Sequence, residues 1–323
     1  MNSIYKGKKL NLTIFGGSHE PILGFKLSGF PKMEIDISKI LEDIKRRQPK
    51  QVGTTKRIEK DEMIIISGIE GNMTTGEDIE IHFKNENVKS EDYNKFYDHP
   101  RPGHVDFVVR KKYEDESMIA GGGIFSGRMT LPMVVAGSLC KQALNYEFHS
   151  RLIHVGLLGN IDYLDKSLVY VEKEKDSVGG LVEVVVKNVE VGLGGPLFQR
   201  LNAKISEAVF SIPGTKTVSF GDDQDALFLK GSQYNDIILD KDGKTKTNYS
   251  AGISGGISNG NDIIVRVTFR PASSIGKPQM TYNFKTDKLE KLVIEGRHDA
   301  AYVRRVPVVV ENMIALALLD EKL

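Results

Sequence analysis

The sequence predicts an α+β protein, because strand-like and helix-like runs are mixed along the chain without regular alternation. The run "KLNLTIFGG" at residues 9–17 alternates apolar and polar residues, as a half-buried strand does. The runs "IDISKILEDIKRRQP" at 35–49 and "LPMVVAGSLCKQALNYEF" at 131–148 repeat apolar residues every three or four positions, as a buried helix face does. The presence of both the strand period and the helix period on one chain indicates the α+β class.

The remaining elements follow from the same periods and from turn residues. Strands are expected at residues 9–17, 61–71, 78–85, 151–161, 181–189 and 263–271. Helices are expected at residues 35–49, 131–148, 197–212 and 308–320. The first helix should begin behind Asp36 or Ser38 as its N-cap and end before Pro49. "DHPRPGHVD" at 98–106 must be a loop because of its prolines and glycine, and the polar stretch 239–252 should be an exposed, mobile connection.

Composition limits the class of protein but not its activity. With 323 residues, 40% of them hydrophobic, the chain fits an ordinary globular protein, and we expect one domain over residues 1–323. Because 44 basic residues nearly balance 43 acidic ones, no global field favours nucleic acid or an anionic membrane as a partner. The single cysteine, Cys140, excludes an internal disulfide. No apolar run has the length of a signal or a membrane span, so a cytoplasmic location is expected.

Glycines cluster at "FGGSHE", "AGGGIFSGR", "GLGG" and "AGISGGISNGND", where the backbone either turns tightly or approaches a ligand closely. None of these clusters is a nucleotide loop. No glycine run ends in Gly-Lys-Ser/Thr, and Ser126 stands where a dinucleotide-binding pattern needs its last glycine. "DKDGKTKTNYSA" lacks the glutamate that closes a calcium loop, so no metal site is expected there.

The stretch "ASSIGKPQMT" at residues 272–281 carries side chains that bind phosphate. Lys277 and Thr281 flank a short turn, Ser273 and Ser274 precede it, and a strand delivers Arg270 just before. A point charge, a planar fork and hydroxyl donors are suited to a phosphate group. A solvated surface turn explains the same residues, but the nearby glycine hairpin ending in Asn259 favours a planar ligand.

Three histidines lie in loops where imidazole can face a cleft, and none has metal-ligand spacing. His19 follows a glycine turn, His104 lies in "RPGHVD", and His298 stands beside Asp299 in "GRHDA". A structural role explains any one of them alone.

Together these residues form an ordered series of motifs that resembles the chorismate synthase family. The series includes "GSH", "RRQP", "TTGEDIEI", "RPGHVD", "AGGGIFSGRMT", "FGD", "GISGGISNG", "FRPASSI" and "GRHDAAYVRRVPVVVENMIALAL". The resemblance covers nearly the whole chain. It implies a β-α-β sandwich, assembled as a homotetramer, that binds reduced FMN and converts 5-enolpyruvylshikimate 3-phosphate to chorismate and phosphate by anti-1,4-elimination. We see no nicotinamide loop, so an external flavin reductant is expected.

The resemblance also assigns roles to single residues. His19 would protonate the departing phosphate, His104 would protonate the reduced flavin, and Asp299 would help to move a flavin proton. Arg47 and Arg128 would grip the anionic substrate. The residues around FMN would be Ser126, Gly255, Asn259, Arg270, Ser273, Ser274, Lys277, Thr281 and Arg297.

Several positions depart from the family pattern, mostly on the substrate side. Gly17 and Glu20 flank the "SH" pair, Ile124 replaces an arginine, and only Lys50 stands near a second missing arginine. These changes predict a substrate pocket that is about three charges more negative than usual, with about 4 kcal/mol at stake per charge 4 Å from a phosphate. Two alternatives to chorismate synthase therefore stay open. One is a divergent FMN-dependent lyase acting on a less anionic compound, and the other is a non-catalytic flavin-binding paralogue.

Overall fold

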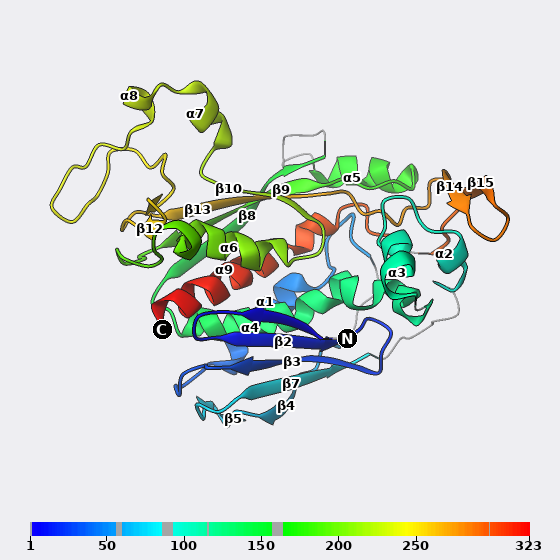
Figure 1. Cartoon of the computed structure of the whole chain (residues 1–323), viewed down its shortest axis with the longest axis horizontal. Helices are drawn as coiled ribbons and strands as arrows, with labels where there is room; N and C mark the ends of the chain where they lie inside the picture. The colour runs from blue at the N-terminus through cyan, green and yellow to red at the C-terminus, as the bar shows by residue number, and fades with distance from the viewer. Residues whose placement is uncertain (1, 56–59, 86–92, 115, 157–163, 297) are drawn as a thin grey trace.

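The computed structural model describes residues 2–55, 60–85, 93–114, 116–156, 164–296 and 298–323. Within them two antiparallel sheets enclose a layer of helices, as Figure 1 shows. This is the β-α-β sandwich that the resemblance implies, and its unalternating elements confirm the α+β class. In this part of the chain, every helix is too short or too polar to cross a lipid bilayer.

The N-terminal part of the chain forms the first sheet. Its strands, in spatial order, are β1 (Ser3–Lys6), β2 (Asn11–Gly16), β3 (Ile22–Ser28), β7 (Ile79–Lys84) and β4 (Ile64–Ser67). All neighbours are antiparallel. In β3, Leu23, Phe25 and Leu27 are fully buried while Lys26 between them is exposed. One face of the sheet therefore packs on the helices, as the two-residue period predicts.

The second sheet has the same alternation. Its strands, in spatial order, are β10 (Thr215–Phe220), β13 (Ile263–Phe269), β9 (Gly180–Lys187) and β8 (Glu147–Val155). Val265 of β13 pairs with Val184 of β9, and both side chains are fully buried. The opposite face of this sheet is polar, because Glu183 on β9 accepts hydrogen bonds from Arg151 and Arg266 on the flanking strands.

Among the described residues, four helices fill the layer between the sheets. They are α1 (Ile37–Arg47), α4 (Thr130–Gln142), α6 (Leu201–Phe210) and α9 (Pro307–Lys322). Every residue of α9 from Val308 to Glu321 is buried, as expected for a helix covered on all sides. Where α4 crosses α9, a Cβ at Gly137 would lie 2.4 Å from the Cβ of Asn312, so only glycine permits this close approach.

Smaller elements surround the sandwich. They are β5 (Ile69–Glu70), β6 (Met73–Thr74), α2 (Lys95–Asp98), α3 (Asp106–Tyr113), α5 (Leu164–Lys173), α7 (Asp223–Phe228), α8 (Gly231–Tyr234), β11 (Ile253–Ser254), β12 (Ile257–Ser258), β14 (Gln279–Asn283) and β15 (Lys288–Leu292). Short 3-10 segments span Glu116–Phe125, Gly127–Met129, Leu197–Gln199 and Tyr302–Arg305. We call residues 222–250 the arm, because its helices α7 and α8 stand away from the sandwich at the upper left of Figure 1.

Most predicted elements are present, with shifted ends. Asp36 caps α1 by accepting a hydrogen bond from the Ser38 backbone at 2.8 Å, as predicted. The prediction of one helix over 131–148 was wrong at its end, because α4 stops at Gln142 and residues 147 and 148 pair with β9 instead. The stretch 239–252 is tied down by hydrogen bonds, since the Asp236 carboxylate accepts from Thr247, Tyr249 and Ser250.

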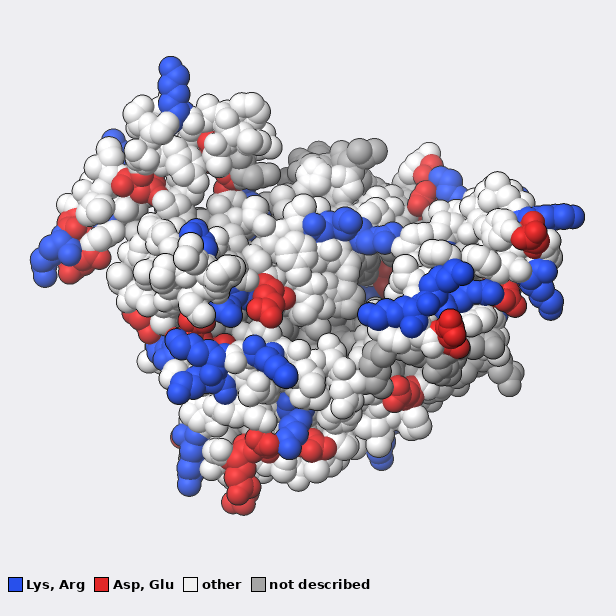
Figure 2. Space-filling model, viewed as in Figure 1, with Lys and Arg blue, Asp and Glu red and all other residues white. Residues whose placement is uncertain are grey.

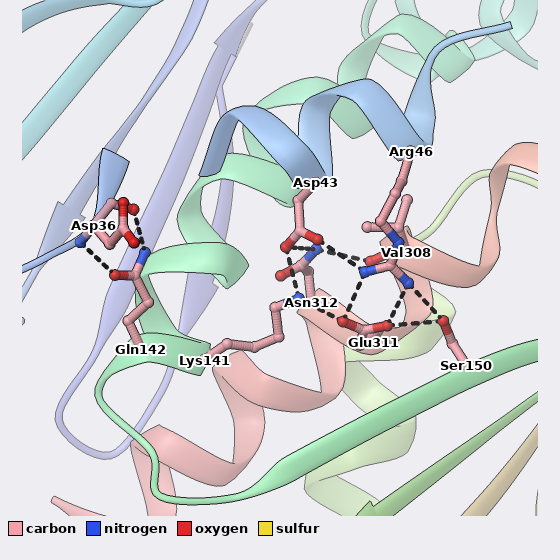
Figure 3. Close-up of polar contacts among 9 residues, drawn as sticks. All are labelled: Asp36, Asp43, Arg46, Lys141, Gln142, Ser150, Val308, Glu311 and Asn312. Atoms are coloured by element: carbon pink, nitrogen blue, oxygen red, sulfur yellow. Dashed lines mark hydrogen bonds and ion pairs between the residues drawn. The ribbon is translucent and has the colours of Figure 1, made fainter. Parts of the chain in front are cut away.

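A buried ionic network joins α1, α4, β8 and α9, as Figure 3 shows. Glu311 on α9 is 2% exposed and binds Arg46 at 2.8 Å, and it also pairs with Lys141. Asp43 pairs with the same two cations at 2.9 and 2.6 Å. Burial alone would raise the pKa of Glu311, but the hydrogen bonds and charges of Arg46 and Lys141 outweigh it and hold that pKa below its ordinary value.

We expect Glu311→Gln to lower the free energy of unfolding by about 2–3 kcal/mol at neutral pH, because it leaves two cations with one carboxylate. The folded pKa of Glu311 lies below its unfolded value, so its stabilisation is complete above about pH 4.5 and is lost as the pH falls further. The difference from wild type should therefore shrink in acid, which urea unfolding at pH 7 and pH 4 measures. Asp78→Asn, in an exposed pair with Lys26, is the control, with an expected change of about 0.5 kcal/mol or less. An equal effect of the two variants would contradict the network's role.

Candidate active site

A cavity of about 840 Å³, here the first cavity, collects loops from both halves of the chain. The predicted site residues that line it are His19, His104, Asp299, Ser126, Ser274, Arg47 and Arg128. They come from the β2–β3 loop, the end of α1, the loops before α3 and α4, and the chain that follows β13 and β15. Residues separated by up to 280 positions therefore meet at one place.

A second cavity, of about 790 Å³, shares a wall with the first. Its residues include His104, Phe125, Gly127, Asp299 and Arg305, which also line the first cavity. Arg270 and Ser273, predicted to contact the cofactor, line only the second cavity. Its walls are more apolar, with Ile124, Met129 and Met133 among them. The two cavities together offer a charged region beside an apolar one.

Four described residues predicted to contact the cofactor are not placed with the histidines. Lys277 and Thr281 line neither cavity: Lys277 pairs with Asp176 at 2.9 Å, and Thr281 donates to the carbonyl of Pro100. Gly255 and Asn259 belong to the β11–β12 hairpin, which lies at the opposite end of the molecule from β14 in Figure 1. One chain therefore does not bring that hairpin to its own cavities. Arg297 lies outside the described residues.

His19 is held in place by the glycine run before α4. A Cβ at Gly121 would lie 1.9 Å from the imidazole, and φ there is +56°, so only glycine fits. The Ser18 hydroxyl donates to the Gly121 carbonyl and therefore accepts from His19 Nδ1, at 3.1 Å. With that hydrogen on Nδ1, Nε2 is the nitrogen that takes up or releases a proton. The ring of Tyr93 packs edge-on against the imidazole, 4.9 Å between centroids.

His104 is oriented by a buried carboxylate. Its Nδ1 lies 2.6 Å from an oxygen of Asp106, which is fully buried and also binds Arg101 through two bonds of 2.7 Å. Burial lowers the pKa of His104, and the charges of Arg101 and Arg270 lower it further, while the hydrogen bond and charge of Asp106 act in the opposite direction. Burial would raise the pKa of Asp106, but its bonds to Arg101 and His104 lower that pKa to about 2. The pair is therefore a carboxylate holding a neutral imidazole at neutral pH.

Asp299 joins two segments of the cavity wall. One carboxylate oxygen accepts from the backbone N–H of Thr55, and the other accepts from Arg305, both at 2.6 Å. The negative charge is thus matched by a guanidinium. Its role as a base near the flavin stays a prediction.

Arg47 and Arg128, the predicted substrate-binding arginines, converge on one acidic residue. Arg47 binds Asp61 at 3.4 Å, and Arg128 pairs with the other oxygen of the same carboxylate. Their Nε atoms are anchored elsewhere, on the hydroxyl of Thr130 at 2.8 Å and on the side-chain oxygen of Asn85 at 3.1 Å. The guanidinium groups are thus fixed side by side at the cavity wall.

The departures from the family pattern fall differently from expectation. Glu20 is exposed and, like Lys50, does not line the first cavity, whereas Ile124 lines the second. The first cavity also has cations that the sequence analysis did not count: Lys95, Arg101 and Arg305. Acidic residues line the same cavity, at Asp61, Glu295 and Asp299, so the charge of this pocket relative to the family stays a prediction, to which Glu20 does not contribute.

The residues present fit a flavin mononucleotide. The side-chain atoms Nε of Arg305 and Oη of Tyr302 are buried at the second cavity without a hydrogen-bond partner among the described residues, as a polar ligand would require. A Cβ at Gly127 or Gly296 would meet nothing within 4 Å, so the wall of the first cavity borders open space at these two positions. Sequence reasoning missed Asp61, Arg101, Asp106 and Arg305, although the "RPGHVD" motif contains two of them.

Comparisons with known proteins agree with this geometry. The family model described as chorismate synthase matches residues 10–323. The chain belongs to the chorismate synthase family. A chorismate synthase of Chitinophaga pinensis is 41% identical, over 99% of this chain and 96% of its own, and one of Christiangramia forsetii is 38% identical, over 97% and 96%.

A crystal structure of chorismate synthase has the same fold, with a TM-score of 0.72 at 22% identity, and the match covers 98% of this chain and 92% of that one. Members of the chorismate synthase family are carbon–oxygen lyases, and this chain is one of them. Family and fold together support chorismate synthase activity within the shikimate pathway. On the face shown in Figure 2, basic and acidic side chains are interspersed, as expected for a chain with nearly equal numbers of both.

Proposed function

We propose that this protein converts 5-enolpyruvylshikimate 3-phosphate to chorismate and phosphate, with reduced FMN bound beside the substrate. The observation that carries the proposal is the meeting of His19, His104 and two arginines in one cavity. Proton donors and guanidinium groups in a single recess are what the loss of a phosphate group requires.

The arginines, the histidines and Asp299 of the cavity have separate roles in the proposed reaction. Arg47 and Arg128 bind the substrate's anionic groups and keep them near His19, whose Nε2 donates a proton to the leaving phosphate oxygen. Asp106 accepts a hydrogen bond from Nδ1 of neutral His104 and so fixes its tautomer, which leaves Nε2 as the atom that takes up a proton and, once protonated, can donate it to the cofactor. Asp299 holds Arg305 and the backbone of Thr55 in the cavity wall, and it would help to move the flavin proton.

FMN would be held by residues that line the two cavities: Ser126, Ser274, Arg270 and Ser273. Lys277 and Thr281 line neither cavity and would contribute from outside them. When bound there, reduced FMN would provide electron density for cleavage of the C–O bond and an acceptor for the hydrogen of the C–H bond. An external partner would reduce it.

A homotetramer would bring the β11–β12 hairpin, with Gly255 and Asn259, to a cavity of a second copy. The arm at the same end of the molecule supports this assembly, since its large apolar side chains are more than half exposed: Leu227, Phe228, Ile237, Ile238 and Leu239. Apolar surface of this extent usually marks an interface.

The double variant Phe228→Ser, Ile238→Ser should dissociate into smaller species and bind FMN at least tenfold more weakly, because the arm no longer buries apolar area between copies. Light scattering after size exclusion, together with flavin titration, measures both effects. Tyr170→Ser, which changes an exposed ring on α5, is the control and should leave both unchanged. A double variant with wild-type mass would exclude the arm as the interface.

The proposed reaction is tested with purified protein, dithionite-reduced FMN and 5-enolpyruvylshikimate 3-phosphate without oxygen, by following chorismate absorbance and phosphate release. Equal amounts of both products support the proposal. Tight FMN binding without turnover would favour a divergent FMN-dependent lyase. The absence of both tight FMN binding and turnover would favour a non-catalytic paralogue.

A further inference from the structure

Asp61 is an acidic residue at the centre of a site that must bind an anion. It is 6% exposed, it lines the first cavity, and its two oxygens bind Arg47 and Arg128 separately. Its backbone has φ of +50°, a left-handed conformation that a non-glycine residue keeps only where its surroundings hold it. The carboxylate is thus fixed on the arginines that the proposed function gives to the substrate.

The arginines do not need Asp61 to aim them. Arg47 is held through Nε by Thr130 and through Nη2 by the carbonyls of Gly127 and Arg128. Arg128 is held through Nε by Asn85. Asp61 uses the Nη1 atom of both, which is where an entering phosphate would bind them.

Two anions on the same pair of guanidinium groups repel each other. A phosphate bound there must therefore displace the carboxylate or weaken its contacts, and the carboxylate can take the arginines back when phosphate leaves. In this exchange, phosphate and the Asp61 carboxylate take turns on the same two arginines. The exchange would keep inorganic phosphate, a product of the proposed reaction, from blocking the site.

We propose that Asp61 acts through Arg47 and Arg128: it competes with phosphate for them and thereby speeds the release of the phosphate product. The inference rests on the proposed function in one respect, that phosphate is formed in this cavity. The competition itself concerns only the chain and inorganic phosphate.

The test compares wild type with Asp61→Asn by calorimetric titration of inorganic phosphate, without flavin or substrate. The variant should bind phosphate at least tenfold more tightly, which corresponds to about 1.4 kcal/mol. During turnover, added phosphate should inhibit the variant at least tenfold more strongly than it inhibits wild type. The variant's kcat should change by a larger factor than its KM, because product release is the step that slows. Unchanged or weaker phosphate binding by the variant would overturn the proposal.

Glu183→Gln is the matched control, because Glu183 is a buried carboxylate that also joins two arginines but lies on the outer face of the second sheet. Its phosphate affinity should stay within about twofold of wild type. If Asp61→Asn is poorly stable, the rise of its melting temperature on adding phosphate replaces calorimetry, and it should exceed the rise for wild type. An equal or smaller rise contradicts the proposal. Phosphate binding is measured without turnover, so the two proposals are tested separately. If wild type makes no chorismate, the proposed reaction is refuted. The phosphate affinities of wild type and Asp61→Asn still decide whether Asp61 competes with phosphate.

Discussion

Asp106→Asn should lower chorismate formation by about 10²–10⁴-fold, the range that a lost proton-transfer residue costs. Asparagine cannot hold His104 as a carboxylate does, because its amide presents a donor or a neutral acceptor to Nδ1. The pKa of His104 should also fall further, since Asp106 is the group that raises it. NMR titration of the ring measures that shift independently of turnover.

The control for this prediction is Asp98→Asn, which removes a half-exposed carboxylate from Arg110 near the same loop. It should retain activity within about twofold, as exposed pairs contribute little. FMN binding and circular dichroism establish whether Asp106→Asn is folded. A folded variant with more than a tenth of wild-type activity would show that His104 needs no orienting carboxylate.

Arg47→Met should raise KM for the substrate about 100-fold while changing kcat much less. Arg47 is almost fully buried at the cavity, and losing one member of a buried charge pair costs about 2–5 kcal/mol. A rise in KM with kcat unchanged indicates that the removed interaction was equally strong in the ground state and the transition state. Steady-state kinetics without oxygen separates the two constants.

Arg151→Met is its control, because Arg151 binds Glu183 on the outer face of the second sheet, away from both cavities. It should leave KM unchanged. Equal KM values for Arg47→Met and wild type would remove Arg47 from the substrate site.

Local signals predicted local structure well. The Asp36 cap and the proline after α1 fix that helix from its own residues, and the alternation in β13 places its valines inward. The end of α4 was missed, because residues 147 and 148 are drawn into pairing with β9, which lies far along the chain.

The sequence predicted five of the residues that line the first cavity with chemistry of their own, His19, His104, Arg47, Arg128 and Asp299, but not Asp61, Arg101 or Arg305, nor Asp106, which binds His104. His104 and Arg47 stand in recognisable motifs, whereas Asp61 matters only because folding brings it to Arg47 and Arg128. Likewise Glu20, next to His19 in sequence, points outward. The spacing of residues in the sequence does not predict which distant segments come into contact, nor where a loop side chain points.

A crystal structure with FMN and 5-enolpyruvylshikimate 3-phosphate would show directly whether substrate and flavin meet the residues of the first cavity. We expect the substrate's phosphate within hydrogen-bond distance of Arg47 and Arg128, with His19 beside it and the flavin ring facing His104. A substrate bound away from these arginines, or a flavin that does not approach His104, would contradict it.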